Sequence, residues 1–170
     1  MEPNINRQPD NGFREEPMDE VRYKPIGMVH SPFKSPKDVP KDDAPLKAAK
    51  GSIEVAREYA DGLKDLEGFS HIVVVFHFHL SKDRPLVVKP YWDNSLRGVF
   101  STRSPSRPNP IGVSVVRLLR REGNILHLQG LDMGEGTPIL DIKPYVPEDR
   151  LRVTRMGWLE KAVKEHEAKR

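Results

Sequence analysis

The chain has 170 residues, no cysteine and a formal net charge of +3. This length suits one domain of roughly 100–200 residues, with room for a terminal extension. The lack of cysteine excludes structural disulfides, thiolate zinc sites, iron–sulfur clusters and a cysteine nucleophile. There is no apolar run of about 20 residues, as a membrane span requires, and no apolar segment typical of a secretory signal at the start. We therefore expect a soluble cytoplasmic protein.

The charge is unevenly distributed along the chain. Residues 1–20 contain six acidic and two basic residues, whereas residues 82–121 contain nine basic and two acidic ones. Such a basic excess suits an anionic partner, with nucleic acid or a phosphorylated ligand as the first candidates. On charge alone, a solvated basic surface without a partner is an equally good interpretation.

Residues 1–50 are predicted to form a tail, a strand and a loop. Residues 1–20 are polar and aperiodic, which predicts a flexible tail. The segment 21–30 alternates loosely and is expected to form a strand. Four prolines within residues 31–50 disfavour both helix and central strand, so we expect an extended loop there. A loop of about 20 residues is more often functional than idle.

The strongest strand is predicted over residues 71–80, after a short strand over 51–55 and a short helix over 57–68. Its apolar face carries Ile72, Val74, Phe76, Phe78 and Leu80. Its other face changes from valines to His77 and His79, as at the rim of a site. We interpret the histidines as rim residues, because a metal site would need a third ligand that nothing nearby in the sequence offers.

The C-terminal half is predicted to add short strands and one long helix. The strands are expected over 86–88, 98–101, 112–119, 124–129 and 139–142, with 112–119 and 124–129 forming a hairpin. From residue 151, apolar residues at helical spacing predict a C-terminal helix over 151–170. Strands that do not alternate with helices favour an antiparallel sheet or barrel over residues 21–150.

Common nucleotide-binding and hydrolase motifs are absent from the chain. It contains no G-x-x-x-x-G-K-[ST] phosphate loop, no G-x-G-x-x-G after a strand, no G-x-S-x-G and no H-E-x-x-H. A Rossmann nucleotide site is therefore not supported.

The segment 100–112, FSTRSPSRPNPIG, is the most unusual in the chain. Its prolines stiffen an extended backbone from which Arg103 and Arg107 project. A stiff loop presents guanidinium groups at a small entropic cost, which suits recognition of a carboxylate or phosphate. A flexible Ser/Pro/Arg linker is the alternative, and the apolar strands on both sides of the loop argue against it.

The segment 131–145, LDMGEGTPILDIKPY, carries the second candidate site. Its Gly-Glu-Gly-Thr-Pro sequence predicts a tight turn whose backbone can approach a ligand closely. Asp141 lies in an otherwise apolar strand, where Lys143 on the same face can pair with it. A binding site and a purely structural turn with an ion pair both remain open.

These two segments, with IGMVHSPF at 26–33 and LEGFSH at 66–71, resemble the TsaA/TrmO family. Bacterial members of that family use S-adenosylmethionine to methylate tRNA at the N6-threonylcarbamoyladenosine beside the anticodon. The resemblance covers about residues 22–148, and Arg-Pro-Asn-Pro-Ile-Gly at 107–112 is its most specific block. It implies a mainly β fold, a single-sheeted antiparallel β-barrel with a short helix and a C-terminal helix. It also implies a homodimer and a cofactor pocket unlike that of Rossmann methyltransferases.

The resemblance also implies roles for individual residues. The S-adenosyl-L-methionine site would comprise Pro40, Lys41, Asp42, His79, Leu80, Arg103, Glu135, Gly136, Thr137 and Pro138. The bacterial pattern has Pro-Arg-Gln at 40–42, His-Gln at 79–80 and Asp at 135, so Lys41, Asp42, Leu80 and Glu135 depart from it. The residues expected to contact RNA are Arg107, Asn109, Lys143 and Tyr145.

Methyl transfer from a sulfonium is an in-line displacement, so the enzyme must align nitrogen, carbon and sulfur. Arg103 is expected to bind an anionic group, either the methionine carboxylate or an RNA phosphate, because the sulfonium is itself cationic. Asp141 is a candidate acceptor for the proton of the methylated nitrogen, with a structural ion pair to Lys143 as the alternative.

The sequence therefore predicts a methyltransferase that N6-methylates threonylcarbamoyladenosine at position 37 of tRNA. Its basic window would face the anticodon stem-loop, and no metal is expected. Two alternatives stay open: a non-catalytic barrel that binds S-adenosylmethionine or RNA, and a methyltransferase that acts on a different acceptor.

Overall fold

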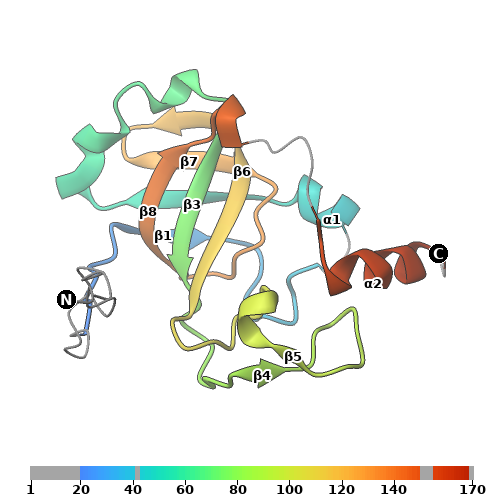
Figure 1. The fold of residues 1–170 in the computed structure, drawn as a ribbon. Helices are drawn as coiled ribbons and strands as arrows, with labels where there is room; N and C mark the ends of the chain where they lie inside the picture. The colour runs from blue at the N-terminus through green and yellow to red at the C-terminus, as the bar shows by residue number, and fades with distance from the viewer. Residues whose placement is uncertain (1–19, 41–42, 150–154, 169–170) are drawn as a thin grey trace, which may run out of the picture.

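The protein is a six-stranded closed barrel in the computed structural model, which describes residues 20–40, 43–149 and 155–168 (Figure 1). The strands follow the order β1-β2-β7-β6-β3-β8, and every pair is antiparallel. They are β1 (Gly27–His30), β2 (Lys50–Val55), β3 (His71–His77), β6 (Ile111–Glu122), β7 (Ile125–Gln129) and β8 (Pro138–Pro144). Pairing of β1 with both β2 and β8 closes the sheet. The single-sheeted antiparallel barrel predicted from the sequence is confirmed.

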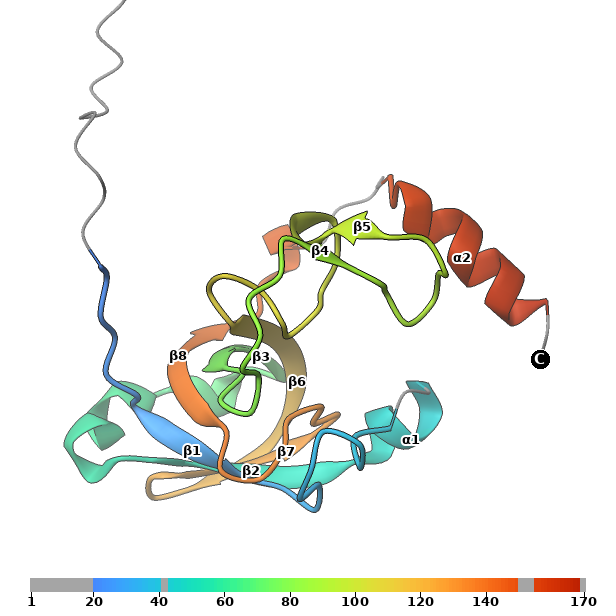
Figure 2. The same cartoon turned by 90° about the horizontal axis from the view of Figure 1, so that it is seen from below.

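A small arm and the C-terminal helix lie side by side beyond one end of the barrel (Figure 2). The arm consists of β4 (Val87–Val88) paired with β5 (Arg97–Gly98). Helix α2 (Trp158–Glu167) is joined to this part of the chain by the indole of Trp158, which donates a hydrogen bond to the Ser101 carbonyl over 2.9 Å. The ring of Trp92 also meets that of His166 edge to face at 4.3 Å.

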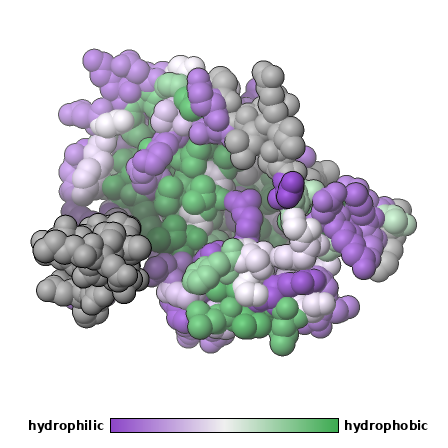
Figure 3. Space-filling view, in the orientation of Figure 1, coloured by the Kyte–Doolittle hydropathy of each residue, from purple (hydrophilic) through white to green (hydrophobic). Residues whose placement is uncertain are grey.

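The outward face of strand β6 carries several exposed apolar residues beside Arg117. Its outward residues Val113, Val115 and Leu119 are 45%, 49% and 41% exposed. They contribute to an apolar area on the barrel wall that faces the viewer in Figure 3. Polar outward residues are the rule for a barrel strand that faces water, so this wall differs from an ordinary solvated surface.

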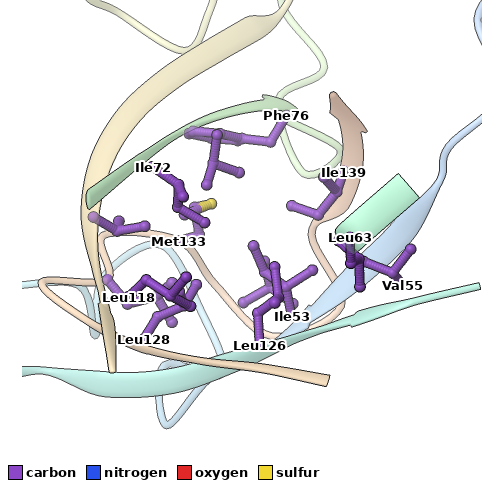
Figure 4. Close-up of a cluster of buried hydrophobic side chains, with 14 residues drawn as sticks. Ile53, Val55, Leu63, Ile72, Phe76, Leu118, Leu126, Leu128, Met133 and Ile139 are labelled. Atoms are coloured by element: carbon purple, nitrogen blue, oxygen red, sulfur yellow. The ribbon is translucent and has the colours of Figure 1, made fainter. Parts of the chain in front are cut away.

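The inward residues of the strands fill the barrel with one apolar cluster (Figure 4). Ile72, Val74 and Phe76 of β3 are buried, and they pack with buried residues of β2, β6, β7 and β8. Full burial of such a side chain contributes roughly 1.5–3 kcal/mol. The interior is therefore a packed core, and ligands must bind outside it.

Phe76 marks the end of this core. Opposite it on β6 lies Gly112, where an added Cβ would lie 2.3 Å from Phe76 Cζ. Only glycine leaves room for the ring at this position. Phe76 also meets Phe78 edge to face, with ring centroids 5.0 Å apart. The two rings together cover the barrel end at which β3 finishes.

The strand predicted over residues 71–80 is shorter than expected. After His77, the Ser81 N–H donates to the Phe78 carbonyl over 3.0 Å, which closes a turn. The turn takes His79 and Leu80 out of the strand, so His77 and His79 do not share a strand face. The period-two pattern continues through a segment in which the backbone has already changed direction.

The short helix predicted over 57–68 is replaced by two 3₁₀ segments, Arg57–Leu63 and Leu66–Gly68. Asp65, between them, has the left-handed φ of 65°, which no continuous α-helix accommodates. The strand predicted over 98–101 is only the end of β5, followed by a 3₁₀ turn, Val99–Ser101.

The predicted loop 31–50 contains a short helix, α1 (Asp43–Ala48). Pro45 is compatible with it because the first turn of a helix needs no backbone N–H donors. The C-terminal helix begins at Trp158 instead of residue 151, and Met156 precedes it. Residues 150–154 and the predicted tail before residue 20 lie outside the described part of the chain. Within the described residues, no helix has the length and apolar character to cross a membrane.

Candidate functional site

Two adjoining cavities lie at the barrel end that Phe76 covers. Their volumes are about 410 and 830 Å³, within the range of small-molecule sites of roughly 300–1,000 Å³. They have a common wall, formed by Val39, Phe76, Phe78, Pro105 and Asp132. A ligand in one cavity would therefore lie next to a ligand in the other.

The smaller cavity, which we call the turn cavity, lies against the Gly-Glu-Gly-Thr turn before β8. Beyond the common wall it is lined by Pro36, His79, Leu80, Ser81, Ser106, Met133, Gly134 and Thr137. The Thr137 hydroxyl donates to the Gly134 carbonyl over 2.8 Å, and Gly136 has a φ of 71°. A left-handed φ favours glycine, so the turn depends on this residue. Three of the predicted cofactor residues, His79, Leu80 and Thr137, meet in this cavity.

His79 is a titratable side chain that lines the turn cavity. Its partial burial, and to a smaller extent the positive charge of a protonated His77, lower its pKa. The ring is therefore neutral at pH 7 and can both donate and accept a hydrogen bond.

The larger cavity, which we call the arginine cavity, opens between the Pro-rich loop and β6. Beyond the common wall it is lined by Pro40, Leu46, Trp92, Phe100, Arg103, Arg107, Pro108, Asn109, Ile111, Gly112, Val113 and Ser114. Arg103 donates to the Val113 carbonyl over 2.7 Å, and Arg107 donates to that of Thr102 over 3.3 Å. These bonds hold two guanidinium groups at the cavity and leave them further N–H donors for a ligand.

Asp132 belongs to the common wall, and the sequence analysis did not single it out. Its Oδ2 accepts a hydrogen bond from the Ser114 hydroxyl over 2.8 Å, whereas its Oδ1 is shielded from solvent and has no partner within the described structure. Burial raises the pKa of Asp132, against the opposing effects of the Ser114 bond, the residue's own backbone N–H and the Arg103 charge. The only sequence signal is a carboxylate between Leu131 and Met133, which are both buried.

Glu135, in contrast, stabilises the turn from the side of β1. Its Oε2 accepts the Ser31 N–H over 2.6 Å, and its Oε1 lies 3.4 Å from Nδ1 of His30. The Ser31 bond is the main reason why the pKa of Glu135 is lowered. The carboxylate does not line either cavity, so its predicted contact with a cofactor stays a prediction.

Asp141 lies on the outer side of β8. Its Oδ2 is 2.6 Å from the ammonium group of Lys143, and the two side chains are 45% and 65% exposed. The ion pair foreseen as an alternative role is present, and Asp141 lines neither cavity. Its role as a proton acceptor stays a prediction.

The other predicted residues are dispersed. Pro138 pairs with Met28 across β8 and β1, and Tyr145 follows β8 at the opposite barrel end, where its N–H donates to the His71 carbonyl. Neither they nor Lys143 lines the two cavities. Lys41 and Asp42 lie outside the described residues.

The basic window 82–121 does not form a single patch. Arg120 and Arg121 lie at the far end of β6, where Arg120 pairs with Glu122 and Arg121 donates to the Leu63 carbonyl. Arg103 and Arg107 lie at the cavities. These four arginines of the basic window therefore lie at two separate ends of the barrel.

A third cavity of about 620 Å³ extends the arginine cavity toward the arm and α2. The two cavities share Trp92, Phe100, Arg103 and Pro105. The third, which we call the aromatic cavity, adds Lys89, Pro90, Tyr91, Ser101, Thr102, Ser104, Trp158 and Leu159. Phe100 is 76% exposed although it is large and apolar. Aromatic rings among cations are typical of surfaces on which nucleobases stack.

Comparisons with known proteins identify relatives of this chain. The family model described as the tRNA-methyltransferase O N-terminal domain matches residues 28–149. A protein of Pyrococcus abyssi, named as a probable S-adenosyl-L-methionine-binding protein, is 55% identical over 144 residues, which cover 84% of this chain and 78% of that protein.

The tRNA (adenine(37)-N6)-methyltransferase of Escherichia coli is 40% identical over 140 residues, covering 76% of this chain and 60% of that enzyme. The crystal structure of TrmO from Pseudomonas aeruginosa superposes with a TM-score of 0.69 at 38% identity, covering 82% of this chain and 62% of that one. The chain thus spans less than two thirds of these two proteins.

Proposed function

The chain belongs to the TrmO family, and we propose that it transfers a methyl group from S-adenosylmethionine to tRNA. The acceptor is N6 of threonylcarbamoyladenosine at position 37. The observation that carries this proposal is the pair of cavities with a common wall, built from the loops that resemble the family. Methyl transfer needs two ligands in contact along one line, and two adjoining cavities meet that need.

The turn cavity and its common wall suit the cofactor. The rings of Phe76 and Phe78 offer apolar surface to an adenine, and neutral His79 can hydrogen-bond to a ring nitrogen. Arg103, close to the wall, suits the methionine carboxylate. Bound S-adenosylmethionine would supply an electrophilic methyl group. The residues present therefore fit this cofactor.

The arginine and aromatic cavities suit the RNA. An anticodon loop offers single-stranded bases, and each base stacked on an aromatic side chain gains about 1–3 kcal/mol. Trp92, Phe100 and Trp158 provide rings, and Arg107 provides a cation for a phosphate. We include Asn109, Lys143 and Tyr145 as RNA contacts on the family resemblance alone. A tRNA substrate places the protein in the cytoplasm.

The apolar outer wall of β6 supports a homodimer. Val115 and Leu119, which line none of the three cavities, expose 49% and 41% of their surface on this wall. Contiguous apolar patches on a barrel wall are typical of subunit interfaces. A second copy of the chain is the partner that the family resemblance implies.

The test measures binding and transfer separately. Isothermal titration with S-adenosylmethionine should give saturable heat, and Arg103→Ala should weaken the affinity about tenfold or more. Arg120→Ala, an exposed arginine at the far barrel end, serves as the matched control and should bind like the wild type.

Transfer is then measured with methyl-labelled cofactor and total tRNA from a strain lacking the N6 methyl group. Label should appear in the threonylcarbamoyladenosine fraction of the nucleosides. Binding without transfer to any RNA would support the non-catalytic module instead. Label in a small-molecule fraction would support a different acceptor, and an absence of binding heat would refute the cofactor assignment.

A further inference from the structure

Asp132 occupies the one place in the described structure where the cofactor and the acceptor could meet. It belongs to the wall between the turn cavity and the arginine cavity, so its carboxylate faces both. Its neighbours in that wall are Val39, Phe76, Phe78 and Pro105, whose side chains bear no hydrogen-bonding groups. Of the side chains in this wall, only that of Asp132 can therefore form a hydrogen bond with the reacting atoms.

The two oxygens of Asp132 have different environments. Oδ2 is held by the Ser114 hydroxyl from β6 at 2.8 Å, which fixes the orientation of the carboxylate. Oδ1 is shielded from solvent and has no hydrogen-bond partner in the described residues. An unsatisfied buried acceptor costs about 1–3 kcal/mol, more if charged, and a catalytic role is one of the explanations for such a group in a native protein, beside an ordered water or ion.

We propose that Asp132 is the catalytic base of the methyl transfer and that its carboxylate accepts the proton of the methylated nitrogen. The assignment rests on the proposed function. In this step a bond forms between the acceptor nitrogen and the methyl carbon, while the bond from that carbon to sulfur breaks. The electron pair of the broken bond stays on sulfur, which becomes a neutral thioether, and the N–H proton moves to Asp132.

The chemistry of the acceptor requires such a base. The N6 nitrogen of threonylcarbamoyladenosine is part of a urea, so its lone pair is delocalised and its nucleophilicity is low. Removal of the proton during attack increases the electron density on nitrogen, and a positioned base contributes typically 10²–10⁴-fold to the rate. The negative carboxylate also suits a site beside a sulfonium cation.

The alternative candidate, Asp141, has a different setting. Its carboxylate lies on the outer side of β8, paired with Lys143 at 2.6 Å and in contact with water. Because it lines neither cavity, it does not contact a ligand bound there. Besides Asp132, the charged and titratable residues that line the two cavities are Arg103, Arg107 and His79, and the charge of Arg103 acts on Asp132.

The test is single-turnover methyl transfer by Asp132→Asn, with cofactor affinity measured in parallel. Asparagine keeps the size of the side chain and can still accept the Ser114 hydrogen bond, but it cannot take a proton. We expect the rate to fall about 10²–10⁴-fold, while the affinity for S-adenosylmethionine changes less than about threefold. Asp61→Asn, an exposed carboxylate remote from both cavities, is the control for a lost negative charge.

A second variant tests whether the pH dependence of the rate follows the titration of Asp132. In Ser114→Ala the carboxylate loses the hydrogen bond that lowers its pKa, so the acid limb of the pH–rate profile should move to higher pH. A merely structural Asp132 would not produce this shift.

The possible outcomes distinguish a failure of the Asp132 assignment from a failure of the proposed function. A wild-type protein without methyl transfer would overturn the proposed function and this assignment with it. An active wild type with an equally active Asp132→Asn would overturn the assignment alone. Loss of cofactor affinity in parallel with the rate would make Asp132 a cofactor ligand and also overturn it.

Discussion

Asp132 and Asp141 flank the same turn, one before it and the other after it, and the fold gives them opposite surroundings. Asp132 faces two cavities with one oxygen unpaired, whereas Asp141 faces water and is neutralised by Lys143. The sequence analysis names Asp141 as the candidate proton acceptor, because it is a carboxylate within an otherwise apolar strand. The comparison shows that burial and pairing, more than the neighbouring sequence, determine which carboxylate can act on a ligand.

The largest expected effect sharpens this comparison directly. Asp132→Asn should slow methyl transfer about 10²–10⁴-fold because it removes the base. Asp141→Asn should cause a far smaller loss, since its charge is already compensated at the surface. Both rates are measured in the same single-turnover assay at saturating cofactor and tRNA. The reverse order of the two effects would return the base to Asp141.

The next effect concerns the wall that holds Asp132. A Cβ at Gly112 would lie 2.3 Å from the Phe76 ring, so Gly112→Ala should displace the ring and cost about 1–3 kcal/mol of unfolding free energy. Denaturant titration measures the cost. Gly98→Ala, where an added Cβ meets nothing, is the matched control. Equal stabilities of the two variants would contradict the tight contact.

The two aspartates should also differ in how they affect stability. Because folding raises the pKa of Asp132, its charged form destabilises the native state at neutral pH. That penalty fades as the pH falls through the raised pKa toward the ordinary one. Asp132→Asn should therefore raise the Tm at pH 7, with the gain shrinking toward pH 4. Asp141→Asn should lower stability by no more than about 1 kcal/mol, as expected for an exposed pair. A destabilised Asp132→Asn at pH 7 would contradict this sign.

The smallest effect concerns Glu135 at the centre of the turn. Its lowered pKa gives stability above its ordinary value of 4.5 that is lost as the pH falls through the folded-state pKa. The pKa of His30 is raised, chiefly by Glu54 and also by Glu135, and this gives stability below 6.5 that is lost as the pH rises through the folded-state pKa.

Glu135→Gln should therefore lower the Tm less than Gly112→Ala does. The difference from wild type should be largest between about pH 4.5 and 6.5. Thermal scans over pH 4 to 9 measure it. A difference that does not vary with pH would contradict a contribution of the Glu135 charge to stability.

Much of the fold could be predicted from the sequence because it depends on local pattern. Alternation identified β3, β6, β7 and β8, and a Glu-Gly pair marked the β6–β7 hairpin. The predictions went wrong where a backbone turn interrupts the pattern, as at His79, or where a left-handed residue such as Asp65 breaks a helix.

Some residues of the candidate site could likewise be predicted from the sequence, and others could not. Arg103 and Arg107 were predicted from their stiff Pro-rich loop, and the structure places both at one cavity. Asp132 was missed because the strand pattern around it, Leu131 and Met133 buried on either side, makes it look like an outward residue. Only the approach of Ser114 from β6 shows that its carboxylate is held at the wall between two cavities.

The sequence by itself determined the barrel class, the two unusual loops and the family they resemble, since these depend on residue order and short-range periodicity. The tertiary structure decided which side chains meet: it divided one basic window between two barrel ends, turned Glu135 toward β1 and placed Asp132 between the cavities. The physical reason is barrel closure. It brings β1 beside β8 and the β3 and β6 ends beside the turn, and no pattern along a single chain records those distances.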